Sequence, residues 1–161
     1  MRKISWIVFL VFVFFLAEFL LFNLGGKWLA PNLLLLLVMF FDFYLGIRYS
    51  LLAAFTAGIL KDSFSAQILG VNLLSFVVSA FLTSVLRKQL YSKGSRSSFY
   101  LMIALVCALT FLVQYILYVF CSVVNFSAAV KSVFFPQIIT TLCVSVFVFK
   151  QLRKCASKLF G

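Results

Sequence analysis

The sequence has no histidine and only three acidic residues among 161. Without histidine, the common zinc sites and the serine and cysteine nucleophile systems lack a partner. The four cysteines show no Cys-x-x-Cys spacing, and the chain has neither a Gly-x-Ser-x-Gly turn nor a phosphate-binding loop. We therefore expect that this protein is not an enzyme and that it holds no metal and no cofactor.

Polar residues of all kinds are scarce. Hydrophobic residues make up 65% of the chain, and phenylalanine alone occurs 22 times. A water-soluble globule of this size could not cover its surface with so few polar residues. Apolar runs long enough to cross a bilayer recur from end to end of the sequence. We therefore expect an all-α integral membrane protein with a single transmembrane domain over residues 1–161.

Charge is almost entirely of one sign, with a formal net charge of +11. Nucleic-acid binding would require basic residues interleaved along a solvated face, whereas here they cluster between apolar runs. That arrangement is typical of loops held on the cytoplasmic side of a membrane, where Lys and Arg can also contact anionic lipid. We expect membrane lipid, and no nucleic acid, among the partners.

The apolar runs predict a bundle of six membrane-spanning helices. Their expected limits are about 4–22, 32–46, 49–60, 70–86, 99–124 and 133–149. The second and third runs could instead be one long tilted helix. Such a helix would place the basic segment 87–96 outside the cytoplasm, so we favour a hairpin that turns near Gly46 to Arg48. Both termini are then cytoplasmic. Of the 14 basic residues, only three are then expected outside: Lys27, Lys61 and Lys131.

Each acidic residue falls in or beside an apolar run, where a carboxylate is costly unless it is capped, paired or hydrated. Asp62 ends the short third run. It could cap a reversing turn by accepting backbone N–H groups two or three residues on, or it could be a ligand or proton site. Asp42 lies deeper and could form a structural pair or a water-bridged contact with another chain. Glu18 poses the same problem nearer the outer face. Lys61 is not expected to pair with Asp62, because adjacent side chains on a helix diverge.

Small and polar residues at the span ends complete the candidate structural or partner-binding set. Pro31 and Asn32 suit the start of the second span, because proline has no N–H to leave unsatisfied there. Gly58 belongs to a small-xxx-small pair that would let another helix approach closely, either within this chain or from a partner. Gly70 and Asn72 open the fourth span, where glycine permits a turn or a close backbone approach.

A basic segment follows the fourth span and is expected to form a cytoplasmic loop. Its cations are Arg87, Lys88, Lys93 and Arg96. Together with the basic carboxy-terminal tail, this loop is where we expect cytosolic partners to bind.

The stretch from Pro31 to about Tyr91 resembles the rod shape-determining protein MreD family, small multi-span proteins of bacterial cell elongation. It carries a Pro-Asn-Leu-Leu start of the second span and a Gly-Ile-Leu-x-Asp string that ends at Asp62. A Leu-Gly pair then precedes the next span at Gly70, and a basic end begins at Arg87. Pro136, followed by a span and a basic tail, is a weaker point of resemblance. The chain length and the six-span count also agree.

The resemblance implies a non-catalytic scaffold in the bacterial cytoplasmic (inner) membrane that maintains rod shape. The implied partners are MreC, the actin-like filament protein MreB, the polymerase RodA and a class B penicillin-binding transpeptidase. The implied fold is similar to the substrate-binding subunits of energy-coupling-factor transporters, which supplies a rival function as a vitamin-binding subunit. The sequence favours the scaffold, because the first span is rich in Phe rather than in small residues spaced by four. The expected outer loops also offer few polar groups to a small ligand.

Overall fold

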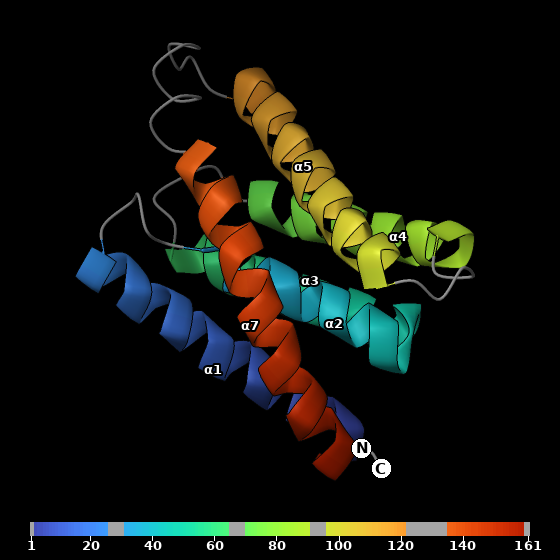
Figure 1. Ribbon diagram of the computed structural model, residues 1–161. Helices are drawn as coiled ribbons and strands as arrows, with labels where there is room; N and C mark the ends of the chain where they lie inside the picture. Colours follow the sequence, from blue (N-terminus) through green and yellow to red (C-terminus); the bar gives the residue numbers. More distant parts are fainter. Residues whose placement is uncertain (1, 26–30, 65–69, 91–95, 122–134, 160–161) are drawn as a thin grey trace.

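The computed structural model describes residues 2–25, 31–64, 70–90, 96–121 and 135–159. Within these ranges the chain forms six helices and no strand, so the expected all-α class is confirmed. The helices are α1 (Arg2–Gly25), α2 (Leu33–Leu45), α3 (Ile47–Phe64), α4 (Val71–Leu90), α5 (Arg96–Cys121) and α7 (Phe135–Leu159) (Figure 1).

Three of these helices are long and apolar enough to cross a membrane, over Ile4–Leu24, Val71–Gln89 and Tyr100–Leu117. Two shorter apolar helical segments, Leu33–Leu45 and Gln137–Leu152, belong to α2 and α7. These findings in the described residues agree with an integral membrane protein built from helices. Six membrane crossings remain a prediction.

The second and third apolar runs form two helices, which excludes the single long helix. Gly46 ends α2 with a φ of 91°, in the left-handed region that glycine adopts without a steric cost. Its N–H donates to the carbonyl oxygens of Phe41 and Asp42 at 3.1 and 3.2 Å, and α3 begins at the next residue. The chain therefore turns at the predicted place.

Helix α3 is longer than the run that predicted it, because it continues through Phe64 instead of stopping at residue 60. The sequence argument ended the run at the charged pair Lys61 and Asp62. Both side chains find partners inside the bundle, as described below, so neither interrupts the helix. The expected reversing turn at Asp62 to residue 65 is therefore wrong as far as Phe64; residue 65 lies outside the described residues.

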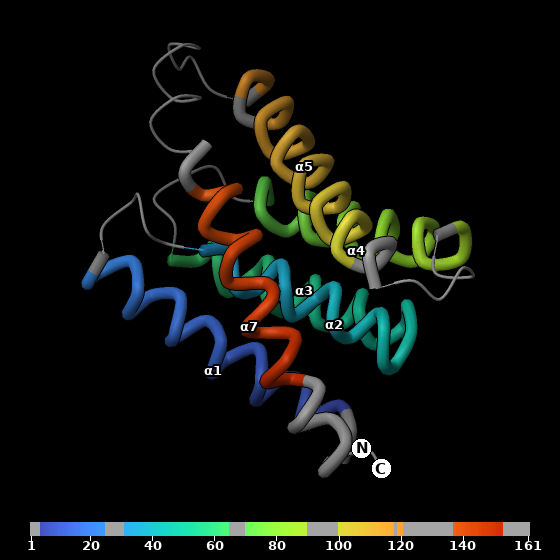
Figure 2. The backbone as a smooth tube through the Cα atoms, in the orientation of Figure 1, coloured from blue at the N-terminus to red at the C-terminus, as the bar shows by residue number. Residues whose placement is uncertain are grey.

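Consecutive helices run in alternating directions, so their ends gather at two ends of the bundle (Figures 1 and 2). We call these the Gly46 end and the Gly70 end. The Gly46 end holds the start of α1, the α2–α3 turn, the end of α4, the start of α5 and the end of α7. The Gly70 end holds the opposite helix ends. The start of α1 and the end of α7 thus lie at the same end of the molecule.

Helix α2 forms the centre of the core, because every residue from Leu33 to Asp42 is buried. It contacts α1, α3, α4 and α7. By contrast, α1 buries only a narrow stripe at Ile7, Val11 and Phe15, spaced four residues apart, and exposes large apolar side chains elsewhere along its length. A surface helix in water would carry polar residues there, so the exposed apolar faces suit contact with lipid.

Gly58 brings α3 against the start of α4. A Cβ placed on Gly58 would lie 2.4 Å from Cα and 2.9 Å from Cβ of Leu73, and the neighbouring Ala54 and Ala57 are fully buried. The small-xxx-small pattern therefore packs within this chain. The close approach allows no side chain at this position.

We expect Gly58→Ala to destabilise the protein by about 1 to 3 kcal/mol, because the added methyl group must push the α4 backbone away. Thermal unfolding of the purified protein in detergent micelles would measure the loss. Ser63→Ala, at an exposed position of the same helix, is the matched control and should unfold like wild type. A Gly58→Ala variant as stable as that control would show that the two helices are not in close contact.

Candidate functional site

Buried polar side chains gather at the Gly70 end and form what we call the polar layer. Every helix in the described part of the chain contributes to it. Its members are Glu18 from α1, Asn32 at the start of α2, Lys61 and Asp62 from α3, Asn72 from α4, Gln114 from α5 and Thr141 from α7.

Asp62 caps the amino terminus of α4. Its Oδ2 accepts the backbone N–H groups of Gly70 and Leu73 at 3.0 and 3.1 Å. Its Oδ1 accepts the backbone N–H and the side-chain Nδ2–H of Asn72 at 3.2 and 2.9 Å. The first N–H groups of a helix have no partner within the helix, and their positive dipole end favours a carboxylate. The sequence argument placed this cap on a local turn, whereas the bonded groups lie eight to eleven residues further along the chain.

The four hydrogen bonds fill the accepting capacity of the Asp62 carboxylate, which is only 4% exposed. This geometry favours a structural role over a ligand or proton site. Gly70 makes the arrangement possible, because its φ of 99° turns the backbone so that its N–H points back to α3. Gln114 extends the cluster to α5, since its Nε2 donates to Oδ1 of Asn72 at 3.2 Å.

Lys61 points in a different direction from Asp62, toward α1 and α2. Its Nζ forms an ion pair with Oε1 of Glu18 at 2.6 Å and donates to Oδ1 of Asn32 at 3.2 Å. The two charged side chains are 20% and 13% exposed, so the pair is largely removed from solvent. Glu18 also accepts the backbone N–H of Leu34 at 3.2 Å, which fixes α1 against the amino terminus of α2.

Asn32 is the N-cap of α2 and links it to α7. Its Oδ1 accepts the N–H of Leu35 at 3.3 Å, and its own backbone N–H donates to Oγ1 of Thr141 at 3.0 Å. A side-chain oxygen at this position satisfies one of the unpaired N–H groups of the first helical turn. Pro31, before it, is buried and outside the helix.

The consecutive residues Lys61 and Asp62 therefore join two halves of the bundle. Successive side chains on a helix diverge by about 100°, so Lys61 reaches α1 and the start of α2, while Asp62 reaches α4 and, through Asn72, is linked to Gln114 on α5. The expectation that the two would not pair with each other agrees with this geometry. The last turn of α3 therefore connects the α1–α2 side of the polar layer to its α4–α5 side.

At the Gly46 end, Arg87 lies against the carboxyl terminus of α2. Its Nη1 donates to the backbone oxygens of Asp42 and, at 3.4 Å, Phe43, and its Nε lies 3.9 Å from Oδ2 of Asp42. The last carbonyl groups of a helix lack partners and form the negative end of its dipole, so they attract a cation. The buried Asp42 carboxylate accepts no hydrogen bond in the described part of the chain. Among the described residues, the Asp42 carboxylate therefore has an ionic contact with Arg87 but no hydrogen bond.

The prediction that Arg87 and Lys88 lie in a cytoplasmic loop is wrong. Arg87 and Lys88 belong to the last turn of α4, and Arg87 is half-buried against α2 instead of being free for a partner. Lys88 is exposed, Arg96 begins α5, and Lys93 lies outside the described residues. Lys and Arg are good helix formers with long flexible side chains, so a basic residue does not end a helix.

The structure offers no assembled catalytic chemistry in the residues that it describes. The carboxylates of Glu18, Asp42 and Asp62 lie in separate contacts, and no group of three or more His, Cys, Asp or Glu residues there could hold a metal ion. What the site can do is fix helices relative to one another.

A protein-family model described as MreD, rod shape-determining protein MreD, matches residues 1–156. The chain belongs to the MreD family. Neither a curated protein nor a solved structure matches it. This MreD-family chain therefore has a role in rod shape determination, within machinery that implies protein partners, and its family is not a known enzyme family. The similarity to energy-coupling-factor subunits stays a prediction, and the family match gives no support to the vitamin-binding alternative.

Several residues that carried the resemblance to MreD belong to the polar layer or support it. Asn32 caps α2, Gly58 permits the α3–α4 contact, Asp62 caps α4, and the N–H of Gly70 donates to that cap.

Sequence reasoning missed the long-range members of the site. The sequence argument placed Glu18 and Lys61 each near the outer face, but it did not predict that they form an ion pair with each other. Gln114 and Thr141 were not singled out. A usable signal existed for Gln114, because it is the only amide side chain in the apolar helix α5 and so needed a polar partner.

Proposed function

We propose that this chain is a non-catalytic membrane scaffold of the bacterial cell-elongation machinery. In this role it links MreC and the wall synthases, RodA and a class B penicillin-binding transpeptidase, to the MreB filament. The observation that carries the proposal is the family match over residues 1–156. It is supported by the engagement of all three acidic side chains in helix-to-helix contacts, which leaves no carboxylate exposed for chemistry.

We propose that the chain crosses the inner membrane six times with the Gly46 end in the cytoplasm. The proposal is supported by three exposed cations: Arg48 in the first turn of α3, Lys88 in the last turn of α4 and Lys150 in the carboxy-terminal half of α7. The positive-inside rule favours such residues on the cytoplasmic side. MreC would bind the bundle within the membrane. MreB would bind the Gly46 end through Lys88, Lys93, Arg96 and the basic tail, without Arg87, which is occupied by α2.

Co-purification from membranes tests this function. The tagged chain, expressed in a rod-shaped bacterium, should recover MreC, and a variant with Lys88, Lys93 and Arg96 changed to Gln should keep MreC but recover several-fold less MreB. Lys131→Gln, expected on the opposite side of the membrane, is the control and should behave as wild type. Recovery with a transporter ATPase module, and without MreC, would contradict the scaffold.

A further inference from the structure

The charge of this chain cannot be balanced from within. Fourteen basic residues face three acidic ones, which gives the net charge of +11. Even full internal pairing would leave that excess of cations without an acidic partner. The carboxylates are moreover taken up inside the bundle, by Lys61, by the amino terminus of α4 and beside Arg87. The counter-charge must come from outside the chain.

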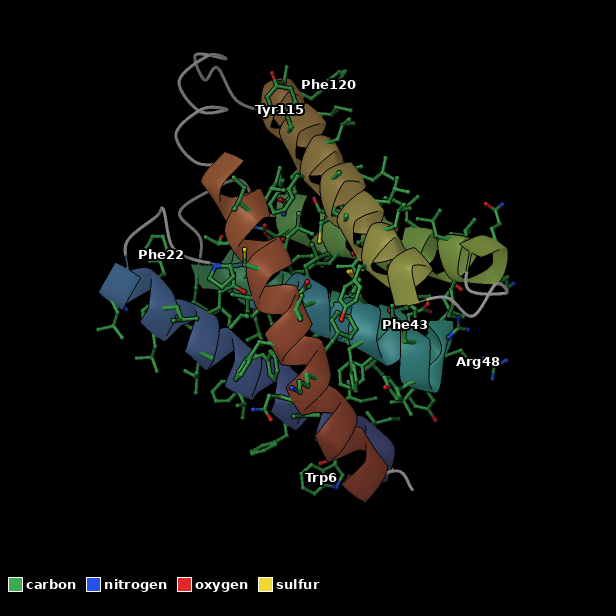
Figure 3. The ribbon with its side chains drawn as sticks, viewed as in Figure 1. Trp6, Phe22, Phe43, Arg48, Tyr115 and Phe120 are labelled. Carbon is green, nitrogen blue, oxygen red and sulfur yellow. The ribbon has the colours of Figure 1, made fainter. Side chains whose placement is uncertain are left out.

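Three exposed cations in the described residues lie at the Gly46 end and come from three different helices. Arg48 opens α3, Lys88 is in the last turn of α4, and Lys150 is on the carboxy-terminal half of α7. Figure 3 shows Arg48 directed away from the bundle at this end. Helix α7 continues beyond Lys150 and carries three more basic residues within its last turns: Arg153, Lys154 and Lys158.

Amphipathic aromatic residues occur at the same end on the remaining helices. Trp6 on α1, Tyr44 on α2 and Tyr100 on α5 are 42%, 44% and 47% exposed. Trp and Tyr combine an apolar ring with a polar tip and concentrate at the headgroup level of membranes. We call these three residues, together with Arg48, Lys88 and Lys150, the cationic–aromatic belt.

We propose that the cationic–aromatic belt binds anionic phospholipid headgroups. Each described helix supplies one belt residue, so cations and rings are distributed among all of these helices at one end of the bundle. A shell of lipids contacts every helix of a bundle, whereas a single acidic protein would cover one side of it. Lys and Arg near a membrane surface are attracted to anionic lipids, and the rings anchor beside them. This inference depends on the proposed membrane location. It shares Lys88 with the proposed MreB-binding segment, whereas Arg48, Lys150 and the three rings belong to the belt alone.

The test uses the full chain in detergent micelles, titrated with phosphatidylglycerol or with phosphatidylcholine. Phosphatidylglycerol should raise the thermal unfolding midpoint and remain bound after repurification, and phosphatidylcholine should do neither. In the variant Arg48→Gln/Lys88→Gln/Lys150→Gln the half-saturating concentration of phosphatidylglycerol should rise by about tenfold or more. Lys27→Gln/Lys131→Gln, which leaves the belt intact, is the matched control and should respond as wild type.

Several results would overturn the proposal. One is a triple variant that responds to phosphatidylglycerol as wild type does; another is an equal response of wild type to both lipids. A matching midpoint shift with inorganic phosphate or with soluble polyglutamate would assign the belt to another anion. If the triple variant proves unstable without lipid, the wild-type response in high salt decides, because exposed charges are screened. A response to phosphatidylglycerol that high salt does not weaken would then count against the belt.

Discussion

Asp62→Ala is expected to destabilise the protein by about 3 to 5 kcal/mol, because charged hydrogen bonds are strong and buried donors without partners are costly. The substitution leaves the N–H groups of Gly70, Asn72 and Leu73 without their acceptor at the buried start of α4. Thermal unfolding in micelles would measure the loss. Hydrogen exchange should report opening of the first turn of α4 before the rest of that helix.

The neighbouring substitution Ser63→Ala provides the control for Asp62. Ser63 is exposed, and within the described residues its hydroxyl donates to the carbonyl of Ile59 in its own helix, so a change within about 0.5 kcal/mol is expected. The loss of stability in Asp62→Asn should lie between those of Asp62→Ala and Ser63→Ala. The amide oxygen can still accept hydrogen bonds, whereas the amide NH₂ faces N–H groups that are themselves donors. Equal stability of Asp62→Ala and Ser63→Ala would refute the cap.

Breaking the ion pair between α1 and α3 is the second large effect that we expect. Lys61→Met leaves the mostly buried Glu18 carboxylate without its cation, at a cost of about 3 to 5 kcal/mol. Glu18→Leu leaves the Lys61 ammonium in the same position. The double variant Glu18→Leu/Lys61→Met should recover most of the stability, because replacing a buried pair by apolar residues of similar size is often neutral.

A double-mutant cycle measures this coupling. Arg48→Met is the matched control for Lys61→Met, because Arg48 lies on the same helix at the opposite end of the bundle. Combined with Glu18→Leu, the control should give an additive loss, whereas the Glu18 and Lys61 changes should be strongly non-additive. Additivity in both combinations would show that Glu18 and Lys61 do not interact.

The sequence predicted the helices and their connections well. Long apolar runs predicted helices, and the need to keep the basic segment 87–96 cytoplasmic predicted a turn near Gly46 to Arg48, which the left-handed backbone of Gly46 explains. The family resemblance also rested on short local strings around Asn32, Asp62 and Gly70, and the match to MreD over residues 1–156 confirms it.

The features that the sequence could not supply depend on tertiary packing. Glu18 and Lys61 are 43 residues apart, and Asn32 and Thr141 are 109 apart, so only the arrangement of the helices brings them together. Arg87 was assigned to a loop because it is basic. Its actual place follows from the unpaired carbonyl groups at the end of α2, which become visible only when α4 packs beside them.

We infer that the buried ionisable side chains Glu18, Lys61 and Asp62 serve the structure of the bundle and carry no chemistry of their own. Rod shape in cells that depend on the Glu18→Leu/Lys61→Met variant tests this claim most directly, with membrane abundance and thermal stability measured in parallel. We predict that this variant, if as abundant and stable as wild type, restores rod-shaped cells and recovers MreC. Round cells that contain wild-type amounts of the stably folded double variant would contradict the claim.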